Sequence, residues 1–142
     1  MSATVRVALL SVQAFVAVTA AAGGAALIAG SVIPTWGFAI VPPAQYLEGS
    51  PFASYVVPGL LLLLVVGGSH AAAFWFGIRR PALVPFAAAT GGYICLIWIF
   101  VQMIYIPFSF LQAVYFVAGL VQVGLSLVLL GVFDRTRVAA RR

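Results

Sequence analysis

The sequence predicts an all-α integral membrane protein, a bundle of four membrane-spanning helices. Of its 142 residues, 65% are hydrophobic and 6% are charged, whereas soluble domains are roughly half apolar and a quarter charged. Four long apolar runs follow one another, and each can cross the ~30 Å hydrocarbon core of a bilayer as a helix. The seven basic residues are all arginines and gather in short clusters beside these runs. This composition leaves no room for a soluble domain.

The predicted spans cover residues 7–30, 55–78, 83–106 and 110–133, in one transmembrane domain over residues 1–142. The first run has features of a signal peptide, because an arginine precedes it and small residues lie near its end. We interpret it as a retained span, since its apolar part is longer than the hydrophobic region of a signal peptide. Alanines at helical spacing predict a face that a neighbouring helix approaches closely: Ala17, Ala21, Ala25 and Ala29.

The second span is the best defined of the four. The chain from Tyr55 to Ile78 carries no formal charge, and as a helix it reaches ~36 Å. Its start allows two interpretations. Either Ser54 caps the helix and Pro58 falls within the first turn, or Ser50 caps it and Pro58 kinks the span.

Between the first two spans lies the one sizeable loop, residues 31–54. It has no lysine or arginine, and its prolines rule out a continuous helix. Aromatic rings such as Trp36 and Tyr46 prefer the headgroup zone, so we expect the loop to lie against the membrane surface. Glu48 is its one charged residue.

The arginines predict the orientation of the chain. With four spans, all of them fall on one side of the membrane: Arg6, Arg79, Arg80, Arg135, Arg137, Arg141 and Arg142. Because arginines collect in cytoplasmic loops, we expect both termini in the cytoplasm and loop 31–54 and the turn at Pro107 outside. The protein is then a multi-pass protein of the cell (inner) membrane. Topology and contact with membrane lipids explain the net charge of +5, so no nucleic-acid partner is expected.

Polar side chains inside a bilayer are costly and mark candidate sites. One group is expected in the outer half of the bundle: Glu48, Tyr55, Gln102, Tyr105, Gln112 and Tyr115. In a functional interpretation these side chains bind a lipid headgroup, a quinone or a small solute, and Glu48 supplies a charge. In a structural interpretation, which we favour, Gln102 and Gln112 bond each other or nearby backbone and hold their hairpin together, for ~0.6–2 kcal/mol each.

Two further polar residues, Gln13 and His70, are expected in the inner half, and Gln122 near mid-depth. A single histidine and a single cysteine, Cys95, with no acidic residue inside the spans, cannot assemble a zinc site or a bis-histidine haem site. The sequence thus indicates no metal and no cofactor. We predict a hydrogen-bonded structural histidine with Gln13 as its partner. No serine has a visible base and no catalytic motif occurs, so no catalytic residue is assigned.

A family resemblance appears in the stretch Tyr46-Leu47-Glu48-Gly49-Ser50-Pro51-Phe52, followed by Tyr55, Pro58-Gly59 and Gly67. The second half adds Ile97-Trp98-Ile99, Pro107, Leu111-Gln112, Tyr115 and Gly119. Together these residues resemble a family of small four-span bacterial membrane proteins, common in actinobacteria, over most of the chain beyond the first span. The family has no assigned activity, so the resemblance implies the fold alone. Many relatives carry an acidic residue in place of Gln102, which makes a proton-linked role harder to assign here.

In span number and size, the chain is also similar to the DoxX-like membrane proteins, an analogy of architecture. We expect a structural or accessory subunit that packs with itself or with a larger membrane protein, and not an enzyme. One alternative is an oligomeric channel or transporter for small solutes, because four spans with few polar groups do not line an aqueous path alone. The other is a subunit of a lipid- or quinone-handling enzyme, with Glu48, Gln102 and His70 as its acid-base groups.

Overall fold

The structure, a computed structural model, describes residues 3–33, 35–36 and 40–132. Every regular element within these residues is helical. Four of the helices are long and apolar enough to cross a membrane: Ala3–Val32, Val56–Arg79, Pro81–Tyr105 and Phe110–Leu129. The all-α prediction is confirmed for these residues, and the four helices have the length and composition that a multi-pass membrane protein needs. The four C-terminal arginines lie outside the described residues.

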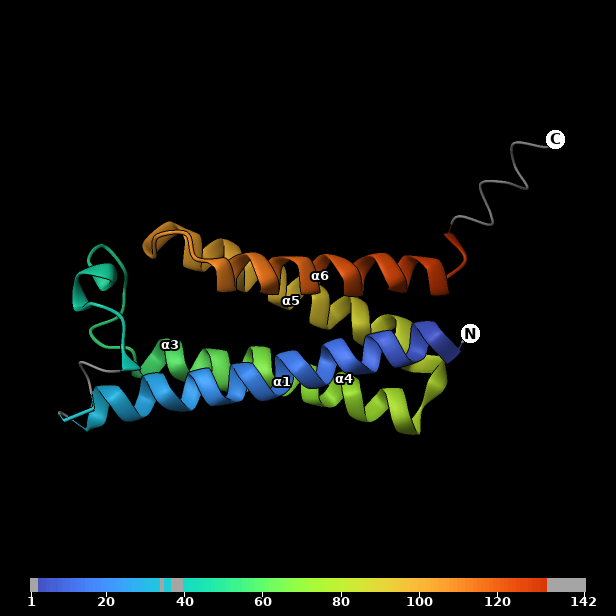
Figure 1. Cartoon of the computed structure of the whole chain (residues 1–142), viewed down its shortest axis with the longest axis horizontal. Helices are drawn as coiled ribbons and strands as arrows, with labels where there is room; N and C mark the ends of the chain where they lie inside the picture. Colours follow the sequence, from blue (N-terminus) through green and yellow to red (C-terminus); the bar gives the residue numbers. More distant parts are fainter. Residues whose placement is uncertain (1–2, 34, 37–39, 133–142) are drawn as a thin grey trace.

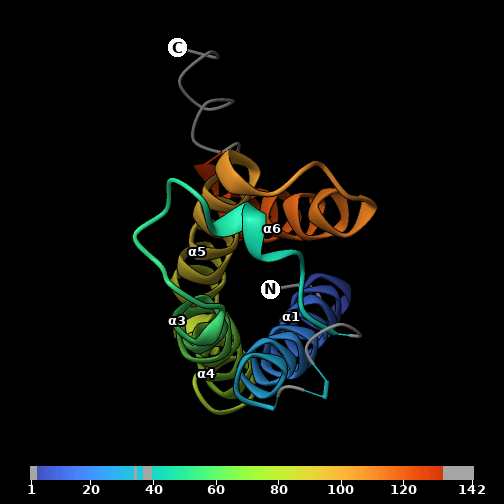
Figure 2. The same ribbon diagram turned by 90° about the vertical axis from the view of Figure 1, so that its left-hand side faces the viewer.

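The spans form two helix pairs that pack on each other (Figure 1). Their elements are α1 (Ala3–Val32), η1 (Ala44–Leu47), α3 (Val56–Leu61), η2 (Leu62–Gly67), α4 (Gly68–Arg79), η3 (Pro81–Leu83), α5 (Val84–Tyr105) and α6 (Phe110–Leu129). The first pair is α1 against the continuous second span α3–η2–α4, and the second pair is α5 against α6. Contacts of α4 with α5 join the pairs, whereas α1 and α6 contact each other sparsely. Figure 2 shows the four spans surrounding a common axis.

Two glycines let α1 and α3 approach each other to backbone contact. A Cβ atom added at Gly24 would lie 2.6 Å from the carbonyl oxygen of Gly59 and 2.8 Å from Cβ of Leu63. A Cβ atom added at Gly59 would likewise lie 2.8 Å from the carbonyl oxygen of Gly24. Neither position has space for a side chain, so this crossing depends on glycine in both helices.

The predicted small-residue face of α1 is confirmed in its first half. Gly67 of the second span lies against the backbone of Ala17 and Ala21. Ala25 is exposed, because the contact continues along Gly24 instead. Small residues of α1 therefore contact the second span as predicted, but in the second half of α1 the contact is made by Gly24 and not by Ala25.

The second span begins one residue later than the first of the two interpretations predicts: Pro58 lies in its first turn, but the N-cap is Tyr55 and not Ser54, and no side chain caps the helix. The helix starts at Val56 with Pro58 in its first turn, and the Ser54 hydroxyl accepts a hydrogen bond from the Val56 N–H at 3.4 Å. The alternative start at Ser50 is wrong, because the Ser50 hydroxyl accepts from Phe52 N–H at 3.2 Å within a turn. The irregular part of this span is η2, a π-helical turn, a feature often found near functional positions.

The fourth span is shorter than predicted. Helix α6 ends at Leu129, whereas the apolar pattern placed its end at 133. Gly131 adopts φ 67°, the left-handed conformation with which glycine commonly ends a helix. An apolar run does not reveal such a stop, because the residues beyond it stay hydrophobic.

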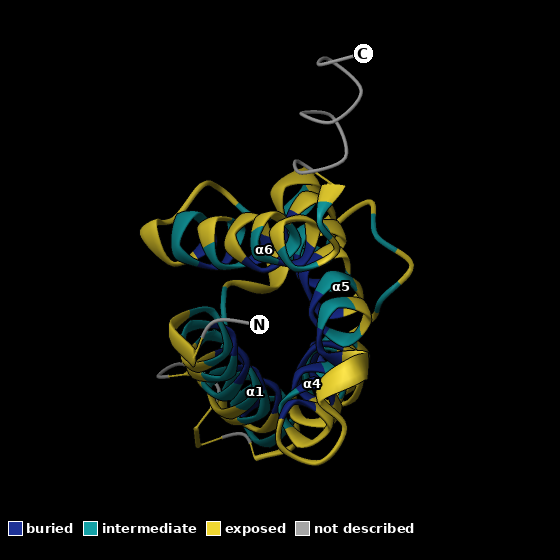
Figure 3. Ribbon diagram, turned by 90° about the vertical axis from the view of Figure 1, so that its right-hand side faces the viewer, coloured by how far each residue is buried: buried dark blue, intermediate teal, exposed yellow. Residues whose placement is uncertain are grey.

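Buried residues lie on the inner faces of the helices and exposed residues on the outer faces (Figure 3). Many of the exposed residues are large and hydrophobic. Arg6 lies near the start of α1 and Arg79 and Arg80 lie at the end of α4, so these three arginines share one end of the bundle. The segment with η1 and Glu48 lies at the opposite end (Figure 1). We refer to these as the arginine end and the loop end.

Candidate functional site

A cavity of about 220 Å³ lies between α1, α5 and α6 near the loop end. We call it the α1–α6 cavity. Its polar lining comes from all three helices and the α5–α6 turn: Thr19, Gln102, Ser109, Gln112 and Tyr115. Apolar groups complete the wall, among them Leu62, Trp98, Ile106 and Leu111. It is an apolar space with a few polar groups, the usual composition of a small-molecule site.

A second, smaller cavity of about 90 Å³ lies on the other side of α5, against α3 and the loop. Tyr55 and Tyr105 line this α3–α5 cavity, and Gln102 lines both cavities. The structure therefore divides the predicted outer group. Gln102, Gln112 and Tyr115 line the α1–α6 cavity. Tyr55 and Tyr105 line the α3–α5 cavity, on the other side of α5.

Glu48 lies apart from both cavities. Its side chain is exposed, and it is not among the residues that line either space. The expectation that Glu48 charges the site is therefore wrong for these two cavities. It follows η1, whose turn carries the carboxylate to the surface of the loop.

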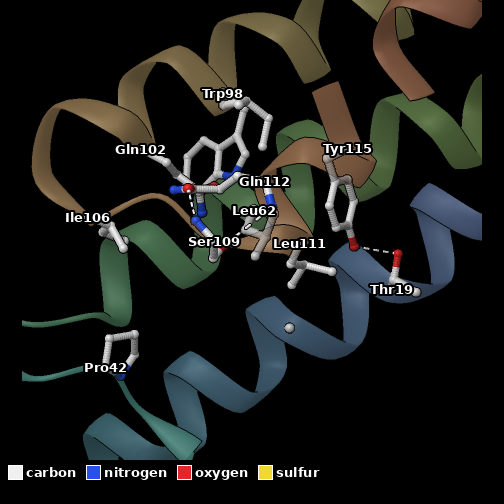
Figure 4. A pocket seen from close by; sticks show the side chains of 12 residues that line it. Thr19, Pro42, Leu62, Trp98, Gln102, Ile106, Ser109, Leu111, Gln112 and Tyr115 are labelled. Atoms are coloured by element: carbon white, nitrogen blue, oxygen red, sulfur yellow. Dashed lines mark hydrogen bonds between the residues drawn. The ribbon is translucent and has the colours of Figure 1, made fainter. Parts of the chain in front are cut away.

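Gln112 is held by a capping box at the start of α6 (Figure 4). Its Oε1 accepts from the Ser109 N–H at 2.9 Å, and the Ser109 hydroxyl accepts from the Gln112 N–H at 3.3 Å. The structural interpretation is confirmed in that Gln112 bonds nearby backbone, but its partner is not Gln102. The spacing Ser-x-x-Gln is the sequence signal for this cap, and it was not among the predicted features.

Tyr115 and Thr19 form a second polar pair across the α1–α6 cavity (Figure 4). The Tyr115 hydroxyl donates to Thr19 Oγ1 at 2.5 Å, and Thr19 donates in turn to the Phe15 carbonyl at 2.6 Å. This pair ties α6 to α1 where the two helices otherwise contact sparsely. Thr19 was not predicted, since a threonine in an apolar run usually bonds its own helix.

The remaining hydrogen-bonding capacity lies at the α5–α6 turn. The side-chain amide of Gln102 forms no hydrogen bond with any described residue. Nε2 of Gln112 and the hydroxyl proton of Ser109 are also without a partner among these residues. These donors converge on one end of the cavity (Figure 4). None of the described residues that line it is charged. The arrangement suits a neutral oxygen acceptor beside an apolar body.

The loop covers the loop end of the bundle through Tyr55. This side chain is buried, and its hydroxyl donates to the Pro43 carbonyl at 2.9 Å. Burial, with a smaller contribution from Tyr46, raises the pKa of Tyr55 above its ordinary value, so the phenol stays a hydrogen-bond donor. Pro42 consequently reaches the α1–α6 cavity, and Leu47 reaches the α3–α5 cavity. Figure 2 shows this segment lying across the helix ends.

His70 is hydrogen-bonded, as predicted, but with a different partner. Its Nδ1 bonds the Val66 carbonyl at 2.7 Å, and its Nε2 bonds Nε2 of Gln122 at 3.1 Å. Gln13 is buried without a hydrogen-bond partner among the described residues. The choice of Gln13 was wrong because sequence does not give the rotation of one helix against another. No group of three or more His, Cys, Asp or Glu occurs within the described residues.

Comparisons of the chain with protein-family models, with curated proteins and with solved structures give no match. The resemblance to four-span bacterial membrane proteins thus stays a prediction. What the protein does has to be inferred from the cavity and from the residues that line it.

Proposed function

We propose that the protein binds a neutral amphiphile in the membrane, and that the α1–α6 cavity holds its head region. The observation that carries this proposal is the set of unused donors, Gln102, Ser109 and Gln112, at one end of an otherwise apolar space. The ligand is then a hydrocarbon chain that ends in a carbonyl-type oxygen, the chemistry that quinones and ester lipids share. We propose binding and not catalysis, because these amides and hydroxyls have no base beside them.

The size of the cavity supports this class of ligand. An engineered apolar cavity of roughly 150 Å³ in another protein holds a benzene ring. The α1–α6 cavity, at about 220 Å³, has room for a substituted ring or for an ester with the first part of its chain. The absence of charge among its described lining residues disfavours a phosphate or a free carboxylate inside it.

Entry is proposed from the side, between α1 and α6. These two helices contact each other sparsely, and Leu111, which lines the cavity, is 60% exposed. In a bilayer, this opening faces the lipid tails. The rest of the ligand chain stays in the hydrocarbon while its head occupies the cavity.

We further propose that the arginine end lies in the cytoplasm, which places the cavity in the outer leaflet of the cell membrane. Arg6, Arg79 and Arg80 share that end, in keeping with the collection of arginines on the cytoplasmic side. Loop 31–54 is then extracytoplasmic. Both termini are cytoplasmic in this orientation.

Cysteine labelling in intact cells tests this orientation. The one native cysteine, Cys95, is buried and is first replaced by serine. Phe108→Cys, in the exposed α5–α6 turn, is expected to react with a membrane-impermeant maleimide. Ala82→Cys, exposed at the arginine end, is expected to react only after permeabilisation. The reverse pattern would place the cavity in the inner leaflet and contradict the proposed orientation.

Trp98 lines both cavities and provides the probe for ligand binding. In a variant with Trp36→Phe and Trp75→Phe, Trp98 is the one remaining tryptophan. Titration with a short-chain benzoquinone, or with a diacylglycerol whose acyl chains are brominated, is expected to quench its fluorescence saturably. The compound whose quenching saturates at the lower concentration indicates whether the ligand is a quinone or an ester lipid. Quenching that rises without saturation in both arms would contradict the proposed function.

Gln102→Leu is expected to weaken this binding without unfolding the protein. Loss of one hydrogen bond costs about 0.5–1.5 kcal/mol, which is roughly a 2- to 10-fold rise in the dissociation constant. Gln45→Leu, at an exposed position in η1, is the matched control and is expected to leave the constant unchanged. If the two substitutions raised the dissociation constant equally, Gln102 would not contact the ligand.

A further inference from the structure

A polar layer crosses the middle of the bundle between two largely apolar layers. It consists of Gln13 of α1, His70 of α4, Gly91 of α5 and Gln122 of α6, one residue from each span, and all are buried. On the loop side the apolar layer contains Val16, Val66, Cys95 and Tyr115, packed by Ala118. On the arginine side the apolar layer contains Leu9, Val84 and Ala88, packed by Leu125. On their own helices, Gln13, Gly91 and Gln122 each lie three or four residues, about one turn, from a member of each apolar layer, and His70 lies four residues from Val66 of the loop-side layer. The four positions therefore share one level.

The hydrogen bonds in this layer fix the state of His70. The Val66 carbonyl can only accept, so Nδ1, 2.7 Å away, carries the proton. Nε2 is then an acceptor and takes its hydrogen bond from Nε2 of Gln122 at 3.1 Å. This assignment follows from the network. It also orients the Gln122 amide, because its nitrogen must face the ring and its oxygen must point away.

Three polar atoms of the layer then have no partner among the described residues: Oε1 and Nε2 of Gln13 and Oε1 of Gln122. Gln13 is 1% exposed and Gln122 is 0% exposed. Buried amide groups in native proteins are almost always bonded to protein or to ordered water. Oε1 of Gln13 and Oε1 of Gln122 each lack a hydrogen-bond donor, and the side-chain NH2 group of Gln13 lacks an acceptor.

We propose that this layer is a water-binding site in the interior of the bundle. A water molecule donates two hydrogen bonds and accepts others, so one or two waters supply the two donors and the acceptor that the layer lacks. Gly91 places no side chain beside the pair of His70 and Gln122. A Cβ atom added there would lie 3.3 Å from Oε1 of Gln122 and 3.4 Å from Nε2 of His70. The site is separate from the α1–α6 cavity and does not depend on the proposed ligand.

His70 is the only histidine of the chain, so labelling with ¹⁵N-histidine gives a single probe in this layer. In lipid bilayers, solid-state NMR is expected to show a protonated Nδ1 and an unprotonated Nε2. Magnetisation from water protons is expected to reach the ring at short mixing times. A ring in the fully folded protein that receives no more water magnetisation than lipid-facing backbone amides would overturn the proposal.

Variants separate bound water from general exposure. Gln13→Leu removes two of the three unmet groups and is expected to reduce the transfer from water to His70 several-fold. Gly91→Ala is expected to have the same effect through the added methyl group. Gly124→Ala is the matched control, because a Cβ atom added there meets nothing within 4 Å, and it is expected to leave the transfer unchanged. Undiminished transfer in Gln13→Leu would also overturn the proposal, whether or not Gly91→Ala folds.

Discussion

Gly24→Val is expected to destabilise the bundle more than any other single change considered for its packing. The added side chain would occupy the place of the Gly59 carbonyl oxygen and the Leu63 side chain, 2.6 and 2.8 Å from the new Cβ atom. Overpacking of this kind costs typically ~1–3 kcal/mol, and backbone on the opposing side leaves little room to relax. The free energy of unfolding in mixed micelles measures the effect.

The control for this variant is Gly68→Val in the second span. Gly68 is exposed, and a Cβ atom there meets nothing within 4 Å. Because valine is a better helix former than glycine in isolation, Gly68→Val is expected to be neutral or stabilising. If the two variants unfold with the same free energy, α1 and α3 do not cross at Gly24.

Gly23→Leu is expected to abolish amphiphile binding while the bundle stays folded. Gly23 lines the α1–α6 cavity, and a Cβ atom there lies 3.4 Å from Cδ2 of Leu62, an ordinary contact. The backbone therefore tolerates a side chain whose outer atoms enter the cavity. We expect the dissociation constant, measured by Trp98 quenching, to rise at least ~10-fold, which is about 1.4 kcal/mol.

Gly124→Leu is the matched substitution at a position with open space around it. It is expected to bind the amphiphile like the parent protein. The two variants are also compared in thermal unfolding, so that loss of binding is not confused with loss of fold. Unchanged binding in a folded Gly23→Leu protein would mean that the ligand lies outside the α1–α6 cavity.

Hydropathy was sufficient to predict the four spans, since lipid solvates the outside of each helix and apolar residues must cover it. The place of Pro58 in the first turn of the second span was also predictable, because the first N–H groups of a helix have no partner within it. The cap was not, since the N-cap is Tyr55 and not Ser54. The end of α6 was not. It depends on the backbone conformation of Gly131, and nothing in the surrounding apolar residues distinguishes this glycine.

The candidate site was predicted in part. Depth along the spans correctly brought Gln102, Gln112 and Tyr115 to one cavity, because depth follows from counting residues. The pairs Tyr115–Thr19 and His70–Gln122 depend on how far each helix is rotated about its axis. That rotation is set by close contacts such as Gly24 with Gly59, and helices that are apolar all round carry little sign of it in their sequence.

Native mass spectrometry of the protein, released from its own membrane with surrounding lipid, tests most directly whether the α1–α6 cavity holds an amphiphile. We expect one bound molecule per chain, with a neutral oxygen-bearing head, to survive release from the parent protein and from Gly124→Leu. The same molecule is expected to be missing from Gly23→Leu. Bare protein in all three samples, or an equal bound mass in all three, would contradict a ligand site between α1 and α6.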